Sequence, residues 1–149
     1  MKLFFDTCTV VEYLCNRKDA TYVEQILVSA EKKGWDCFIS VGSFYTLVYL
    51  IELHLKHNGL SDKEERIKRL REILANIMDT FFVSDISETD LVNSIHDEHF
   101  LDIEDSCQYR AALASECDFL ITINVKDFKN ADSSLIKILT PSEFCTEIK

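Results

Sequence analysis

Acidic and amide side chains follow two short apolar runs, and their oxygens could bind a cation. Asp6 ends the run at residues 3–5, and Asn124 and Asp127 come behind the run at residues 119–121. Bounded apolar runs of this length predict strands buried in a parallel sheet. The carboxyl ends of such strands border the crevice in which α/β sheets bind ligands, so these side chains are expected to gather there. The alternative is an ordinary helix cap at Asp6 and an ordinary turn after the second run.

A further set of acids lies at a predicted helix start. Asp102 and Asp105 are three residues apart and therefore face the same way on a helix, with Glu104 between them. The alternative is that Asp102 caps this helix and that the other two acids only favour its dipole. Thr122 alternates with Asn124 at the end of the second apolar run, so both side chains can turn toward the crevice.

Carboxylate oxygens with little histidine or cysteine suit Mg²⁺ or Mn²⁺. Two such ions, about 3.5–4 Å apart, can activate water and stabilise the leaving oxygen in phosphodiester cleavage. Without a cation, clustered carboxylates would repel and raise one another's pKa. The four histidines form two pairs one helical turn apart, which we interpret as surface or partner-contact positions: His54 and His57, and His96 and His99.

Strands and helices alternate along the chain. The predicted strands are residues 2–5, 36–39, 81–83, 119–121 and 136–139. Helix caps are predicted at Thr9 (with Glu12), at Ser40 or Ser43, and at Ser61 (with Glu64), Ser87, Asp102 and Thr140. One helix is expected over residues 20–33 and stops at Gly34. This alternation predicts an α/β fold, a three-layer sandwich with a mainly parallel central sheet.

Composition bounds the classes of function. A chain of 149 residues, 47% of them hydrophobic, predicts one globular domain over residues 1–149. The net charge of −10 opposes a broad electrostatic grip on nucleic acid, but it allows a metal-mediated contact with phosphates and suits a basic protein partner. No stretch predicts a membrane span or signal peptide, so a cytoplasmic location is expected. The six cysteines contain no C-x-x-C pair, which argues against structural zinc.

Three motifs together resemble the PIN domain family. They are FFDT at residues 4–7, DIEDSCQY at 102–109 and ITINVKDF at 121–128, and the segment TPSEF at 140–144 is similar to the end of one bacterial subgroup. PIN domains are small α/β nucleases that cut RNA with Mg²⁺ or Mn²⁺. Many bacterial members are toxins of the VapC kind, each neutralised by a small antitoxin.

The resemblance implies roles for individual residues. Asp6 would be the first acidic ligand and Asp105 the acid of the later helix. Thr122 would support the site from its strand end. Asn124 occupies a position where many members carry a further Asp, and Asp127 is the nearest charged substitute.

Two departures reduce the number of expected ligands. The Glu that the family usually carries on the helix after the second strand falls at Thr46, and Cys8 replaces an Asn that often follows the Asp-Thr pair. Glu52 is nearly two turns beyond Thr46 and is not expected to substitute. Asp102, Glu104 or Asp127 would have to compensate; otherwise metal affinity or activity is reduced.

The leading hypothesis is a metal-dependent endoribonuclease, a toxin component, with Asp6, Asp105 and Asp127 as its catalytic acids. Asn124 would join these three as a metal ligand, and Thr7, Thr122, Asp102 and Glu104 would support them. The alternative is a degenerate PIN-like domain that works by binding a protein, such as a small basic antitoxin. A phosphohydrolase acting on small molecules ranks lowest, because no Gly-rich phosphate loop is present.

An apolar helix face could join two copies of the chain. Phe44, Tyr45, Val48 and Tyr49 recur at helical spacing on the helix that follows the second strand. We predict either a homodimer through this face or ordinary core packing.

Overall fold

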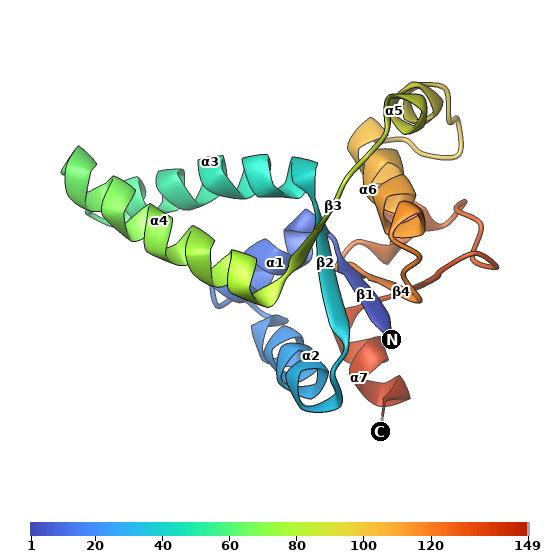
Figure 1. Cartoon of the computed structure of the whole chain (residues 1–149), viewed down its shortest axis with the longest axis horizontal. Helices are drawn as coiled ribbons and strands as arrows, with labels where there is room; N and C mark the ends of the chain where they lie inside the picture. Colours follow the sequence, from blue (N-terminus) through green and yellow to red (C-terminus); the bar gives the residue numbers. More distant parts are fainter. Residues whose placement is uncertain (149) are drawn as a thin grey trace.

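The computed structural model describes residues 1–148, and its centre is a five-stranded parallel sheet (Figure 1). The strands are β1 (Lys2–Phe5), β2 (Asp36–Ser40), β3 (Phe82–Ser84), β4 (Phe119–Ile121) and β5 (Lys137–Leu139), in the spatial order β3-β2-β1-β4-β5. All four neighbouring pairs are parallel. The predicted α/β fold is therefore confirmed, and each predicted strand lies within one residue of an observed one.

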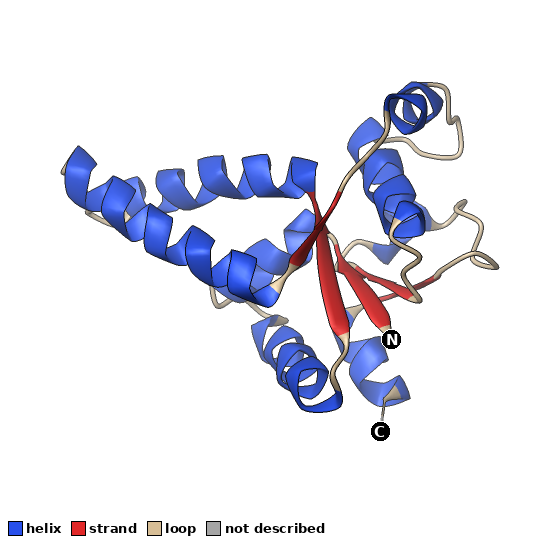
Figure 2. Ribbon diagram, in the orientation of Figure 1, coloured by secondary structure: helices blue, strands red, loops and turns tan. Residues whose placement is uncertain are grey.

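Helices cover both faces of this sheet (Figure 2). They are α1 (Thr7–Leu14), α2 (Ala20–Lys33), α3 (Val41–His57), α4 (Lys63–Thr80), α5 (Glu88–Ile95), α6 (Ile103–Ala114) and α7 (Pro141–Glu147), with a 3₁₀ turn, η1 (Val125–Phe128). Among the described residues, no helix is long and apolar enough to cross a membrane.

The central strand separates two hydrophobic cores. Leu3 and Phe5 of β1 lie in a core with α1, α2, α3, α4 and α7, whereas Phe4 lies in a second core with α6 and η1. All three side chains are fully buried. Successive residues of a strand point to opposite faces, so this run needs no polar alternation. Burying each such side chain contributes about 1.5–3 kcal/mol. Because β1 is apolar on both faces, helices cover both sides of the sheet, and the fold has three layers.

The strand order reverses between β1 and β4. From β1 the chain continues outward through β2 and β3 on one side, and β4 and β5 lie on the other. Loops that leave the carboxyl ends of two such strands diverge and leave a crevice between them. Asp6 follows β1 and Thr122 follows β4.

Two predicted helix caps are wrong. Helix α1 begins at Thr7, two residues before the predicted cap, because the Thr9 hydroxyl donates to the Ile121 carbonyl and Glu12 accepts from the Asp19 backbone. Helix α4 is capped by Asp62, whose carboxylate accepts from the Glu65 backbone N–H, and not by the predicted Ser61.

Other predicted helix ends are confirmed. Ser40 caps α3 and accepts from the backbone of Ser43, which settles the choice between these two residues. Ser87 and Thr140 form capping boxes, and Asp102 caps α6. The left-handed backbone of Gly34 ends α2, as a C-terminal glycine often does.

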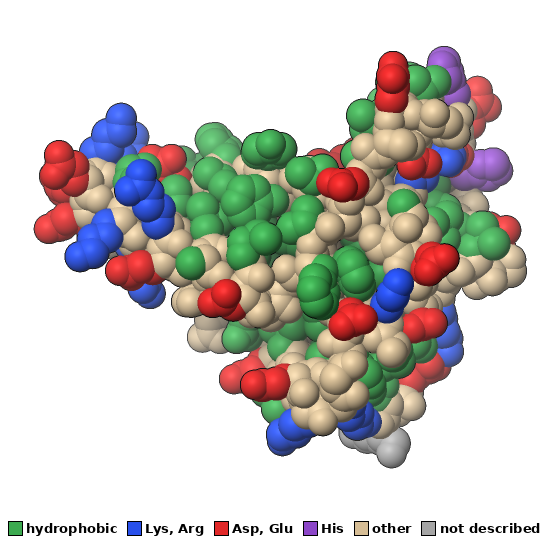
Figure 3. Space-filling model, in the orientation of Figure 1, with side chains coloured by type: hydrophobic (Ala, Val, Ile, Leu, Met, Phe, Trp, Pro, Cys, Tyr) green, Lys and Arg blue, Asp and Glu red, His purple; other side chains and the backbone are tan. Residues whose placement is uncertain are grey.

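The apolar face of α3 divides into a buried and an exposed part. Phe44 and Val48 are half-buried, while Tyr45 and Tyr49 are 71% and 66% exposed. The prediction of core packing is therefore wrong for Tyr45 and Tyr49. Figure 3 shows hydrophobic side chains gathered over α3 and α4 on the face in view.

Candidate active site

Asp6 lies at the carboxyl end of β1, buried at the point where the strand order reverses. Its backbone N–H donates to the Ile121 carbonyl at 3.0 Å, which ties it to β4. Its Oδ2 accepts two side-chain hydrogen bonds, from Thr122 Oγ1 at 2.8 Å and from Cys8 Sγ at 2.9 Å. Asp6 is also the N-cap residue of α1, yet its side chain makes no capping bond. Its carboxylate is therefore directed to the crevice residues.

Burial is the largest influence on the pKa values of Asp6 and Cys8. It raises the pKa of Asp6 above its ordinary value, against the lowering effect of the hydrogen bonds from Cys8 and Thr122. Burial, followed by the nearby Asp6 charge, raises the pKa of the Cys8 thiol to about 12. Cys8 is therefore a neutral thiol at physiological pH, and it can donate its proton to the carboxylate.

Thr122 connects Asp6 to the segment behind β4. Its side chain is fully buried and, besides donating to Asp6, accepts from the Asn124 backbone N–H at 3.1 Å. Asn124 is half-buried and immediately precedes η1, where Asp127 is exposed. The structure therefore joins Asp6, Thr122 and Asn124 through hydrogen bonds, whereas Asp127 lies at the solvent edge.

Asp105 lies in the first turn of α6, and the charge of Asp6 acts on it. Its pKa is raised to about 7, first by burial and then by the charges of Asp6, Asp102, Asp127 and Glu104. The charges of Asp6, Asp102, Asp127 and Glu104 thus act on Asp105, and we call these acids and Asp105 the five crevice carboxylates.

Asp102 and Glu104 have less direct positions. Asp102 Oδ1 accepts from the Glu104 backbone N–H at 2.8 Å, so Asp102 is the helix cap that the alternative interpretation described. The pKa of Glu104 is raised by burial and by the charges of Asp102 and Asp6. Both acids contribute negative potential at the start of α6.

The donor set fits a hard divalent cation, because it consists of carboxylates and one amide. Across residues 1–148, no three His, Cys, Asp or Glu side chains stand close enough together to form a metal site. Burial first, and then the charges of the neighbouring acids, raise the pKa of Asp105, so a bound cation would relieve a repulsion between carboxylates.

The position of the usual family Glu contains no carboxylate. Thr46 is half-buried on α3, one turn beyond Ser43. Glu52 is engaged elsewhere, because Arg66 Nε lies 3.4 Å from its Oε1. The expectation that Glu52 does not substitute agrees with this contact.

Sequence reasoning missed a buried polar network beside the acids. The Gln108 amide Nε2 donates to Thr7 Oγ1 at 2.8 Å and to Ser43 Oγ at 2.9 Å. The two hydroxyls are 2.7 Å apart, and Ser40 Oγ donates to Ser43 Oγ at 3.0 Å. The available signal was the spacing of Gln108, three residues after Asp105 and so on the same face of one helix.

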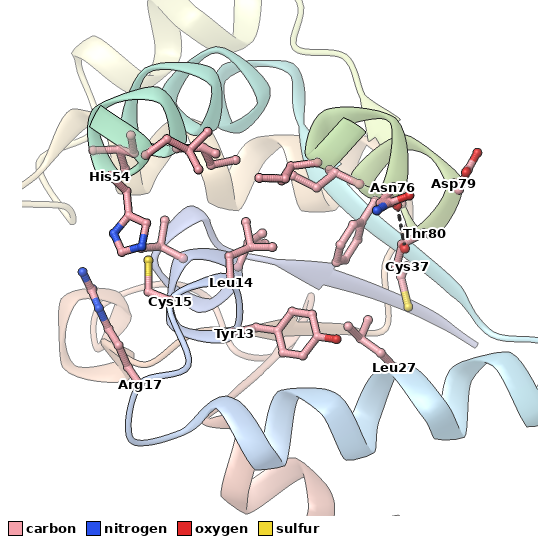
Figure 4. Close-up of a pocket in the computed structure, with 18 of the residues that line it drawn as sticks. Tyr13, Leu14, Cys15, Arg17, Leu27, Cys37, His54, Asn76, Asp79 and Thr80 are labelled. Carbon is pink, nitrogen blue, oxygen red and sulfur yellow. Dashed lines mark hydrogen bonds between the residues drawn. The ribbon is translucent and has the colours of Figure 1, made fainter. Parts of the chain in front are cut away.

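A separate groove of about 1080 Å³ runs between the α1–α2 and α3–α4 helix pairs. In Figure 4, Tyr13, Leu14 and Leu27 point into this space, while Arg17 and His54 lie at one end. The lining is mainly apolar, and none of the five crevice carboxylates belongs to it. His54 is thus placed in a groove rather than at the acids.

Comparisons with known proteins agree with this architecture. The sequence pattern of the PIN domain family matches residues 2–126. No curated protein matches the chain. Among solved structures, the fold is similar to the crystal structure of VapBC2 from Rickettsia felis bound to a DNA fragment from their promoter, with a TM-score of 0.62 and 15% identity over 94% of this chain and 98% of that chain. That likeness concerns the fold, whereas the family match spans most of the sequence: the chain belongs to the PIN domain family.

Proposed function

We propose that this chain is a metal-dependent endoribonuclease that hydrolyses RNA phosphodiesters with Mg²⁺ or Mn²⁺. The observation that carries the proposal is that buried Asp6 lies where the strand order reverses, close enough to Asp105 for its charge to raise the pKa of Asp105. Asp6, Asp105, Asn124 and Asp127 would hold the cation. When bound, the ion supplies activation of water and stabilisation of the charge that develops on phosphorus.

The chain's own residues prepare that site. Thr122 and Cys8 hold one oxygen of Asp6, which fixes the orientation of its carboxylate. Asp105 titrates near neutral pH, so it can release its proton when a cation arrives. Asp127, exposed on η1, can complete the ligand set from the solvent side.

The test is Mn²⁺-dependent cleavage of a mixed RNA pool by Asp6→Asn. This change keeps the size of the side chain and removes its charge, so cleavage should be abolished. The matched control is Asp36→Asn, an exposed acid at the start of β2 and so at the opposite end of the sheet, which should cleave as the unmodified chain does. Unchanged cleavage by Asp6→Asn would overturn the ligand assignment.

A second candidate is a degenerate domain that works through protein association. Thr46 in place of the family's usual Glu favours it, together with the groove of about 1080 Å³. Titration of the purified chain with Mn²⁺ in a calorimeter separates the two candidates. Binding with activity supports the nuclease, whereas no binding at millimolar Mn²⁺ supports the association role.

In either case we propose a small basic antitoxin as the partner, with an amphipathic helix in the groove. The apolar lining and the net charge of −10 suit a helix with an apolar face and basic flanks. The test is co-purification with the product of a small neighbouring reading frame. Val28→Asp, at the groove, should abolish it, and Val92→Asp, at a similarly exposed position on α5, should not.

A further inference from the structure

A buried polar network connects the starts of α1 and α3 with α6. Its members are Thr7 at the start of α1, Ser40 and Ser43 at the start of α3, and Gln108 on α6. All four are at most 7% exposed. The Gln108 amide donates to Thr7 and Ser43 across sequence separations of 101 and 65 residues, so the network is a tertiary connection.

Each end of this network lies close in sequence to one of the two acids, Asp6 and Asp105. Thr7 directly follows Asp6, and Gln108 lies one helical turn after Asp105. The other amide atom of Gln108, Oε1, is buried without a hydrogen-bond partner among the described residues. Leaving such an atom unpaired costs about 1–3 kcal/mol, so Gln108 is a costly way to fill this space.

Repulsion between Asp6 and Asp105 opposes the connection that Gln108 makes between α6 and the start of α1. After burial, the Asp6 charge is the largest influence that raises the pKa of Asp105. Two hydrogen bonds from one rigid amide resist that repulsion, because both hydroxyls belong to other helices.

We propose that Gln108 is a positioning residue that fixes the separation between the carboxylates of Asp6 and Asp105. The proposal rests on the proposed function, since the separation matters most when these carboxylates share a cation. Gln108 acts through its hydrogen bond to Thr7 and through its own helix.

The test compares Gln108→Leu with Ser84→Ala. Leucine is close in size to glutamine but cannot donate a hydrogen bond. Ser84 is equally buried and anchors the far end of the same helix, with bonds of 2.7 Å to the Ala111 carbonyl and to Ser115 Oγ. Both variants should lower the stability of α6 packing, but only Gln108→Leu should alter the acids.

Two measurements follow. In calorimetry, Gln108→Leu should weaken Mn²⁺ binding by about tenfold, as losses of supporting hydrogen bonds at metal sites commonly do, while Ser84→Ala binds normally. In metal-free crystal structures, Asp105 should lie farther from Asp6 in Gln108→Leu than in Ser84→Ala. An unchanged separation would overturn the positioning role, even if the unmodified chain bound no Mn²⁺. That absence of binding would count only against the proposed function.

Thr7→Val provides a second route should Gln108→Leu fail to fold. It removes one hydroxyl partner at nearly constant volume and should weaken Mn²⁺ binding in the same direction. The variant with both substitutions should bind Mn²⁺ no more weakly than the single variant with the lower affinity. Both substitutions remove the same connection between Gln108 and Thr7. Additive losses would contradict a shared network.

Discussion

At the scale of single residues, two side chains orient the carboxylate of Asp6. Thr122 and Cys8 both donate to the same oxygen, and each is buried or partly buried. The chain thus keeps the orientation of its central acid while it lacks the family's usual Glu. Placing a carboxylate at position 46 tests whether the missing Glu limits metal binding.

Thr46→Glu should strengthen Mn²⁺ binding. Thr46 is half-buried one turn beyond Ser43, whose hydroxyl is 2.7 Å from that of Thr7, so a longer acidic side chain can extend toward the crevice. A further carboxylate adds a hard oxygen ligand and more negative potential. Calorimetry should show a dissociation constant lowered by about tenfold. The control is Tyr45→Glu, which adds the same charge at a position 71% exposed and should change affinity little.

Asp105→Asn should stabilise the metal-free chain more at pH 8 than at pH 5. Folding raises the pKa of Asp105 from its ordinary value of 3.8 to about 7, so the folded chain holds this proton more tightly than the unfolded chain. The resulting stabilisation is full below about pH 4 and is lost as the pH rises through 7. Asparagine has no proton to lose. Urea unfolding at the two pH values measures the difference, and an equal effect at both would contradict the raised pKa.

The sequence predicted that Asp6, Thr122 and Asn124 lie at strand ends, but it did not predict the hydrogen bonds around them. Asp6, Thr122 and Asn124 follow apolar strands, and strand ends are visible as a change in residue type. The network of Gln108, Thr7 and Ser43 is not visible in this way. Side-chain amides and hydroxyls are ordinary on helices, and only tertiary packing decides that they meet.

At the scale of elements, local signals succeeded where a side chain had only local partners. Ser87 caps α5 through its own third residue, Asp90, so the motif alone determines the structure. Thr9 and Glu12 failed because both bond to other segments, Ile121 and Asp19. A capping motif is thus unreliable where a strand end lies close enough to compete for the same hydroxyl.

Strand β1 illustrates which parts of the fold are predictable. Its three apolar residues pack on both faces of the sheet, and a short unbroken apolar run indicates that environment directly. The order β3-β2-β1-β4-β5 could be determined only from the structure, because an apolar run does not indicate which strands lie beside it. That order alone brings the ends of β1 and β4 together.

At the scale of the whole molecule, negative charge is both abundant and unevenly placed. The net charge is −10, and the charges of Asp6, Asp102, Asp127 and Glu104 all act on Asp105. Folding without a cation therefore proceeds against repulsion at this edge of the sheet. A bound divalent ion would convert that repulsion into attraction, so the stability of the whole chain should depend on metal.

We therefore expect Mn²⁺ to raise the melting temperature of the chain. A ligand that binds only the folded state contributes about 2.7 kcal/mol at a concentration of 100 times its dissociation constant. For a chain of this size that corresponds to roughly 5–10 °C. Scanning calorimetry with Mn²⁺, and then with added chelator, measures the shift and its reversal. NaCl at equal ionic strength should give a smaller shift, because it only screens the carboxylates. Asp6→Asn should lose the Mn²⁺ shift, whereas Asp36→Asn should keep it. A shift retained in Asp6→Asn would place the stabilising ion elsewhere on the acidic surface.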